Sequence, residues 1–237
     1  NGLAQIASDT GDIAEAKSLF TKALGFFSDT DDLVNTLLQI GYIHLAQGEF
    51  ELADLKYEEA RTLAEEANSN RDLAKVLQAI GSSRMTTGLW AEALQFNMQS
   101  LRISTDLENT WGMASANTGV GNAYNLMGAN ALAVNHYLIS DSLYVQVDNE
   151  LSRATPINNI GDIYYNQGDY EGALPYFEKA FQIQATAAKR KFVSFERNLF
   201  GWLIASGDLI KELGSLFVFI PVVDNLGRLV GRITIDD

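Results

Sequence analysis

The chain has 237 residues, with no cysteine, only 3 prolines and only 2 histidines. The absence of cysteine excludes disulfide bonds and thiolate-ligated metal sites. His44 and His136 have no second nitrogen ligand nearby in the sequence, so we expect ordinary core or surface imidazoles and no metal site. Because proline is scarce, long helices can form without interruption, which favours an all-α chain.

Basic residues are also in short supply, with 17 Lys and Arg against 30 Asp and Glu and a formal net charge of −13. Nucleic acids and anionic membrane surfaces both need neutralising cations, so we expect neither as a partner. No apolar run reaches the roughly 18 residues of a membrane span. No signal peptide is visible and we expect a cytoplasmic location, although a chain that begins at Asn1 leaves open that a targeting segment was removed.

Small residues recur at a fixed interval of 40 positions, for example Gly81 after Gly41 (81 − 41 = 40). Three registers keep this period: Gly41, Gly81, Gly121, Gly161 and Gly201; Gly48, Gly88, Gly128 and Gly168; and Ala53, Ala93, Ala133 and Ala173. Self-similarity of this kind predicts a solenoid, in which each unit buries its apolar face against its neighbours.

The clearest unit spans residues 154–186 and contains two amphipathic helical patterns on either side of the turn 166–169. Helices joined by so short a turn lie antiparallel and close together. The pattern resembles the tetratricopeptide repeat, which has a small residue and a tyrosine in its first helix and alanine and aromatic positions in its second. The period of 40 exceeds the usual repeat of about 34 and looks like the longer-repeat branch, which includes kinesin light chains and bacterial peptide-sensing regulators.

This resemblance covers residues 3–206 and implies an all-α, right-handed superhelix of antiparallel helix pairs. Residues 1–216 would form the solenoid, with one partial N-terminal repeat, four full repeats at 33–67, 72–106, 112–147 and 152–187, and one degenerate C-terminal repeat. The second full repeat is irregular, because Arg84 replaces the tyrosine and Asn97 replaces the second aromatic residue.

Residues 217–237 change character and are predicted to form a strand, a turn and a second strand, like a β-hairpin. The stretch resembles the end of a CBS domain of the magnesium-transporter type, and the resemblance implies Thr234 and Asp237 as weak candidates for nucleotide contact. Only about twenty residues match, so we expect a remnant without a bound cofactor. We expect it to pack around Phe200, Leu203 and Leu209, or to pair with a strand from another chain.

The resemblance to tetratricopeptide repeats also implies that the first helix of each pair faces a concave groove. Polar side chains predominate at the corresponding positions, which include Lys75, Met85, Ser115 and Thr155. An asparagine offers both a donor and an acceptor and can pair with a peptide backbone; the alternative is that these amides only cap helices and fill turns. The predicted peptide-binding residues are Gln78, Ser82, Thr118, Asn122, Asn125, Asn158, Asn159, Asp162, Tyr165, Asn198 and Trp202.

The sequence therefore predicts a scaffold that binds a peptide or an extended protein segment in this groove. We find no pair of nucleophile and base and no phosphate loop, and we expect no enzyme. The acidic balance favours a neutral or basic partner. Two alternatives remain open at this point: a ligand-sensing regulatory module coupled to a C-terminal CBS-like or signalling domain, and an architectural subunit that assembles with itself as a homo-oligomer.

Overall fold

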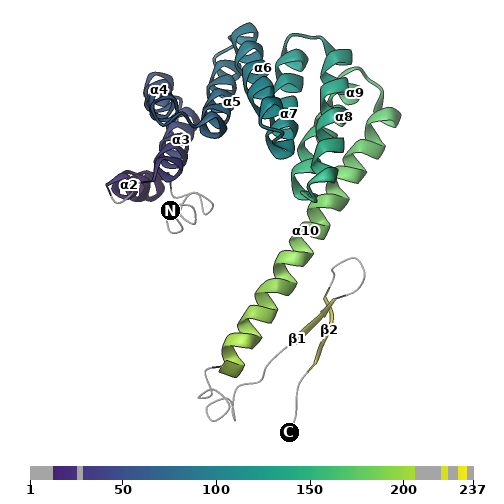
Figure 1. Ribbon diagram of the computed structural model, residues 1–237. Helices are drawn as coiled ribbons and strands as arrows, with labels where there is room; N and C mark the ends of the chain where they lie inside the picture. Colours follow the sequence, from purple (N-terminus) through teal and green to yellow (C-terminus); the bar gives the residue numbers. More distant parts are fainter. Residues whose placement is uncertain (1–12, 26–28, 206–219, 224–228, 234–237) are drawn as a thin grey trace. The chain divides into compact units, whose positions relative to one another are not determined.

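The computed structural model describes residues 13–25, 29–205, 220–223 and 229–233 (Figure 1). It divides into two compact units, Asn1–Ala185 and Thr186–Asp237, which are described separately.

The first unit is built from helices whose bounds repeat with the period of the sequence. The starts of α3, α5 and α7 are 40 residues apart, and each of these helices is 17 residues long. The bounds are α2 (Ile13–Leu24), α3 (Thr30–Ala46), α4 (Phe50–Glu66), α5 (Asn70–Thr86), α6 (Trp90–Asp106), α7 (Thr110–Leu126), α8 (Asn130–Gln146), a 3₁₀ turn η1 (Leu151–Arg153), α9 (Ala154–Asn166) and α10 (Tyr170–Ala205).

Each helix packs against the next one along the chain, and the first helices of successive repeats, α3, α5, α7 and α9, also contact one another (Figure 1). This arrangement is an all-α helical repeat solenoid. The first helices thus form one continuous face, and the second helices α4, α6 and α8 pack behind it. Among the described helices, none combines the length and the apolar character that crossing a membrane requires.

The turn inside each repeat has the same hydrogen bonds, which explains its glycine. At the end of α3, Gly48 has a φ of +76°. Its amide donates to the carbonyl of Leu45, and the amide of Glu49 donates to the carbonyl of His44. This is a Schellman motif, in which the residue after the C-cap must adopt the left-handed conformation that glycine tolerates best. Gly88, Gly128 and Gly168 occupy the same position.

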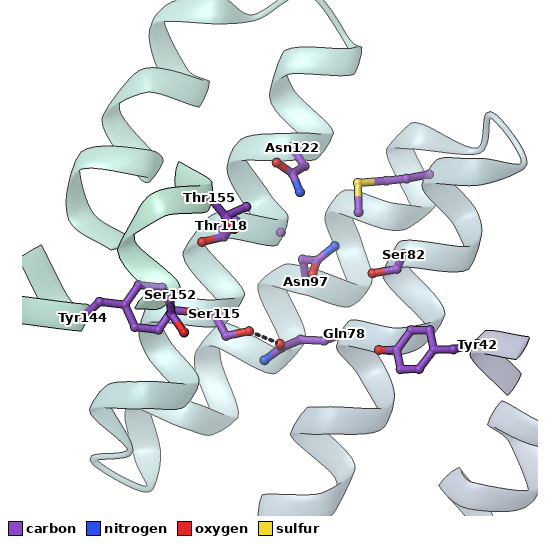
Figure 2. Close-up of a pocket in the computed structure, with 12 residues that line it drawn as sticks. Tyr42, Gln78, Ser82, Asn97, Ser115, Thr118, Asn122, Tyr144, Ser152 and Thr155 are labelled. Carbon is purple, nitrogen blue, oxygen red and sulfur yellow. Dashed lines mark hydrogen bonds between the residues drawn. The ribbon is translucent and has the colours of Figure 1, made fainter. Parts of the chain in front are cut away.

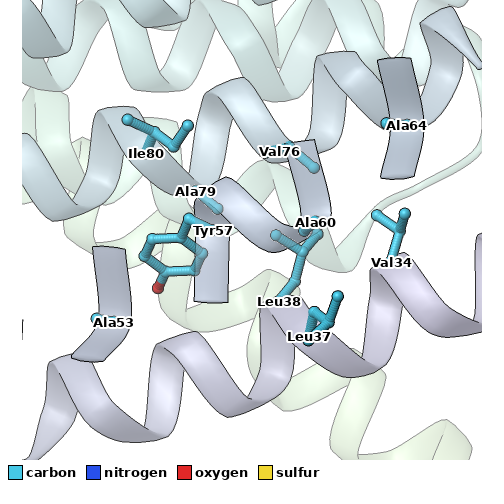
Figure 3. Close-up of a cluster of buried hydrophobic side chains, with 10 residues drawn as sticks. All are labelled: Val34, Leu37, Leu38, Ala53, Tyr57, Ala60, Ala64, Val76, Ala79 and Ile80. Atoms are coloured by element: carbon cyan, nitrogen blue, oxygen red, sulfur yellow. The ribbon is translucent and has the colours of Figure 1, made fainter. Parts of the chain in front are cut away.

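In α3, α7 and α9 the glycine lies under an aromatic ring of the following helix, whereas in α5 the side chain over Gly81 is the Asn97 amide. A Cβ atom added to Gly121 would lie 2.6 Å from the Tyr137 ring, and one added to Gly161 would lie 2.7 Å from the Phe177 ring. The predicted close approach is therefore present. A cluster of small and branched side chains surrounds the corresponding ring of the first full repeat (Figure 3): Val34, Leu37, Leu38, Ala53, Tyr57, Ala60, Ala64, Val76, Ala79 and Ile80.

Helix α10 begins in the first unit and runs without a break to Ala205, so residues of the predicted fourth and fifth repeats belong to one helix. In the second unit, β1 (Ile220–Val223) pairs antiparallel with β2 (Leu229–Ile233). The residues between these strands, and the side chains against which the tail is expected to pack, lie outside the described residues. The hairpin-like tail, its cover and the domain boundary at residue 216 stay predictions.

Candidate functional site

A pocket of about 300 Å³ opens on the face formed by the first helices (Figure 2). It spans four successive repeats, since its walls come from α3, α5, α7 and α9, with contributions from α6, α8 and η1. Its lining comprises Tyr42, Gln78, Ser82, Met85, Asn97, Ser115, Thr118, Gly119, Asn122, Tyr144, Ser152 and Thr155. Every one of these side chains is uncharged.

Four of the predicted binding residues meet in this pocket: Gln78, Ser82, Thr118 and Asn122. Gln78 is held between two neighbouring helices. Its Nε2 donates to Ser100 Oγ at 3.0 Å, and its Oε1 accepts from Ser115 Oγ at 2.6 Å. Both ends of this amide are therefore engaged, and they tie α5 to α6 and α7.

Asn122 is held in a similar way, but only through its oxygen. The Oδ1 atom accepts from the Tyr137 hydroxyl at 2.8 Å and from Asn159 Nδ2 at 2.9 Å. These two donors fix the orientation of the amide. Within the described part of the chain its Nδ2 donates to no protein acceptor, and Figure 2 shows this nitrogen directed toward the pocket.

A third link between first helices is ionic. The Lys75 ammonium donates to Asp31 at 2.5 Å, to Asp72 at 2.9 Å and to Asn35 at 3.4 Å. Burial opposes the charged form, but the hydrogen bonds to the two carboxylates outweigh it and raise the pKa of Lys75. The hydrogen bond from Lys75 also holds the pKa of Asp31 below its usual range. The positive charge of Lys75 is therefore balanced by two carboxylates of the chain itself.

Beside Lys75 lies a second hollow of about 100 Å³, which shares Gln78 with the larger pocket. Trp111 forms part of its wall, and the buried Ser104 hydroxyl has no hydrogen-bond partner there. The lining residues are Arg71, Ala74, Lys75, Gln78, Ser104, Asn109, Trp111 and Gly112.

Other predicted binding residues lie on the same helices but do not line the large pocket. Asn158 donates to Asp162 at 2.9 Å, one turn further along α9. Tyr165 is 55% exposed and packs edge-on against Tyr170. Asn159 is engaged with Asn122, and Asn125 lies at the C-terminal end of α7. The side chains of Asn198 and Trp202, and the residues Thr234 and Asp237, lie outside what the structure describes.

Sequence reasoning missed several pocket residues, notably Tyr42, Asn97 and Tyr144. Asn97 comes from a second helix, and the sequence pattern marks it only as an irregularity of the core. It is 1% exposed and lies between Gly81 and Gly119, where an added Cβ would come within 2.5 Å and 2.1 Å of its amide. The signal was present in the sequence, because a small amide replaces the aromatic ring of the other repeats beside the extra glycine Gly119.

Family models of the tetratricopeptide repeat match residues 156–186 and residues 1–29. These findings support a tetratricopeptide-repeat protein. A fold of this kind is generally a non-enzymatic scaffold for other proteins. The repeats therefore indicate a protein–protein interaction module. Nothing in the comparisons shows catalysis. Neither match includes residues 217–237, where the resemblance to a CBS domain stays a prediction. A comparison with curated proteins gives no match.

Several solved structures resemble the fold of this chain at low sequence identity. A Rap protein complexed with competence and sporulation factor is 14% identical, with a TM-score of 0.69 over 87% of this chain and 58% of that chain. BtubC from P. vanneervenii is 18% identical, with a TM-score of 0.60 over 78% of each chain. The TPR-like repeats of a putative kinesin light chain from Podosopora anserina are 15% identical, with a TM-score of 0.56 over 79% of this chain and 94% of that chain.

Proposed function

We propose that the chain binds an extended protein segment along the face formed by α3, α5, α7 and α9. The observation that carries this proposal is the pocket of about 300 Å³ on that face, whose lining comes from four repeats and is mostly polar and uncharged. An extended peptide needs hydrogen-bond partners for its backbone at regular intervals, and a repeated row of small polar side chains supplies them.

The hydrogen bonds of the face divide its polar residues into two groups. Gln78 and the Oδ1 atom of Asn122 are used to hold neighbouring helices together. Ser82, Asn125 and the Nδ2 atom of Asn122 make no side-chain hydrogen bond within the described residues. We assign peptide contact to this second group, because such groups can pair with a guest without breaking an existing bond.

The partner that suits this face is neutral or basic. The pocket itself carries no charge, while the net charge of the chain is −13. The negative net charge of the chain would therefore raise the rate at which a basic segment associates with it. The neutral pocket would then bind the uncharged part of that segment.

A blocking substitution tests this function. Ser82→Arg places a long side chain in the pocket, whereas Ser142→Arg adds the same charge at an exposed position of α8 that does not line it. Both variants would be compared with the native chain by selection against an unbiased library of extended peptides, followed by fluorescence anisotropy on the selected peptides. We expect Ser82→Arg to weaken binding by about tenfold or more, since loss of the contacts removes about 1.4 kcal/mol or more.

The Ser142→Arg control should bind like the native chain. Thermal unfolding of both variants checks that each remains folded. Failure of the native chain to select any peptide, or equal affinity of folded Ser82→Arg and Ser142→Arg proteins, contradicts the proposed function.

A further inference from the structure

The pocket exists because the second full repeat lacks an aromatic ring. Tyr57, Tyr137 and Phe177 each lie over the glycine of their own repeat: Gly41, Gly121 and Gly161. Asn97 holds the same position over Gly81, and an amide is much smaller than a phenol ring. The next first helix adds to the space, because Gly119 presents no side chain toward Asn97.

Asn97 leaves one hydrogen-bonding atom unused in this space. Its Nδ2 donates to the Ala93 carbonyl at 2.8 Å, which fixes the orientation of the amide. Its Oδ1 accepts from no group in the described part of the chain, although the residue is 1% exposed. This oxygen is not among the fully enclosed unpaired atoms of the described residues, and Asn97 lines the pocket, so a group inside the pocket can reach it. A guest that donates to this oxygen would give it the partner that the protein does not supply.

A donor group faces the same pocket from α7. Asn122 Nδ2 is directed toward the pocket, and its orientation is fixed by the two hydrogen bonds that its own Oδ1 accepts (Figure 2). Among the side-chain amides that line the pocket, Asn97 Oδ1 is therefore a free acceptor and Asn122 Nδ2 is a free donor. No charged side chain lines it.

These features define the chemistry of the guest. A carboxylate would find no cation and would meet the Asn97 oxygen, and an ammonium or guanidinium group would find no anion, so either charge would lose hydration without compensation. An aliphatic side chain would leave both free groups unsatisfied. A carboxamide carries a donor for Asn97 and an acceptor for Asn122 in one neutral group.

We propose that this pocket is a subsite for a glutamine or asparagine side chain of the bound protein segment. The inference rests on the proposed function and specifies it. Within the extended segment, one carboxamide enters the second repeat, where Asn97 Oδ1 accepts from its NH₂ and Asn122 Nδ2 donates to its carbonyl oxygen. The other repeats lack this subsite, since an aromatic ring fills the equivalent space.

The test uses the full chain and an oriented peptide library in which one central position is fixed in turn as each of the twenty amino acids. We expect glutamine and asparagine to be selected over glutamate, aspartate and leucine at that position. For a single selected peptide measured by fluorescence anisotropy, replacing glutamine by glutamate should weaken binding by about tenfold.

Two substitutions in the pocket sharpen this test. Asn97→Tyr restores the aromatic ring of the other repeats and should keep the unfolding midpoint unchanged or higher while abolishing the preference for carboxamides.

Asn122→Asp keeps an oxygen that accepts from Tyr137 and Asn159 and replaces the free donor by a carboxylate oxygen. Selection at the fixed peptide position should therefore move toward lysine and arginine. Met98→Tyr, at the neighbouring exposed position of α6, is the matched control and should select like the native chain.

The possible outcomes separate the subsite from the function on which it rests. Peptides that bind the native chain without any preference at the fixed position, or with a preference that Asn97→Tyr leaves intact, overturn the carboxamide subsite and leave peptide binding standing. If no peptide of the library binds the native chain, the proposed function and the subsite both fail.

Discussion

The glycines at 40-residue intervals are explained by a contact between a backbone and a ring. In α3, α7 and α9 the glycine removes a Cβ atom that would otherwise lie 2.3 to 2.7 Å from an aromatic ring, at Gly41, Gly121 and Gly161. The period alone predicted a close approach of two helices. The structure adds that the approaching group is the ring of a second helix and not its backbone.

Gly161→Leu tests this contact. We expect the substitution to lower the free energy of unfolding by about 1–3 kcal/mol, because the added carbons overlap the Phe177 ring and neighbouring side chains must move. Gln182→Leu, at an exposed position of α10, is the control and should change stability little. Chemical denaturation measures both variants, and an equal midpoint for Gly161→Leu and the native chain would show that the period does not mark a packed contact.

Asp141 makes the stability of the solenoid depend on pH. Burial alone would raise its pKa, but hydrogen bonds from Arg153 at 2.6 Å and Lys179 at 3.0 Å outweigh burial and lower the pKa below its ordinary value of 3.8. A lowered folded-state pKa means that the contribution to stability is fully present above about pH 4 and is lost as the pH falls through the folded-state pKa.

Asp141→Asn should therefore destabilise the chain by about 1–3 kcal/mol at neutral pH. The difference from the native chain should shrink as the pH is lowered below about 4. Asp106→Asn, whose ion pair with Arg102 is 3.9 Å long and exposed, is the control and should show a small, pH-independent effect. Thermal unfolding between pH 2.5 and 7 measures the difference, and a constant effect of Asp141→Asn across this range would argue against an ionic role.

The candidate site was predictable in part, and the reason is physical. The resemblance to tetratricopeptide repeats implies which helix face is used, and the 40-residue period places Ser82 and Asn122 at equivalent positions of that face, with Gln78 one turn before Ser82. The hydrogen-bond partner of each side-chain amide was not predictable. An asparagine that bonds to a neighbouring helix and one that bonds to a guest occupy the same kind of position in the sequence. The sequence showed that Asn97 replaces the aromatic residue of the other repeats, but the repeat pattern assigns that position to the core, so the prediction did not place Asn97 at a pocket wall.

At the scale of helices and turns, the turns between repeats differ from those within them. The turns after α4, α6 and α8 adopt the same left-handed conformation without glycine, at Asn68, Glu108 and Asp148, with φ values of 53°, 51° and 51°. Asparagine and aspartate tolerate this region because their short polar side chains can form local hydrogen bonds, whereas glutamate is less suited to it.

Glu108→Gly should consequently stabilise the chain by about 0.5–1 kcal/mol, because it relieves the left-handed conformation at that turn. Asn68→Gly, at the equivalent turn one repeat earlier, should have the smaller effect. Differential scanning calorimetry of the two variants makes the comparison. A lower unfolding midpoint for Glu108→Gly than for the native chain would contradict this account of the turns.

Several helix boundaries are marked in the sequence by a residue with a local role. Gly48, Gly88, Gly128 and Gly168 end the first helices, and Ser69 and Asn109 cap the N-termini of α5 and α7. Helix α10 shows what happens when such a marker is missing. Ala188 occupies the position of Asn68, Glu108 and Asp148, and because alanine favours the helix and disfavours the left-handed region, α10 continues through the expected junction.

At the scale of the whole molecule, the acidic balance should affect the rate of binding more than its strength. A peptide with basic flanks should associate faster than the same peptide with neutral flanks, and raising the salt concentration should reduce this advantage. Stopped-flow fluorescence at several ionic strengths measures the association rate constants. Equal rate constants for the two peptides at low salt would contradict steering by the net charge of −13.

The central claim is that the face of the first helices holds an extended protein segment. The most direct measurement is a crystal structure of the chain with a peptide selected from the unbiased library. The account predicts an extended peptide that runs across α5, α7 and α9, contacts Ser82 and the Asn122 amide nitrogen, and places a side chain beside Asn97. A peptide bound instead to the exposed surfaces of α4, α6 or α8, with the pocket at Asn97 empty, would contradict it.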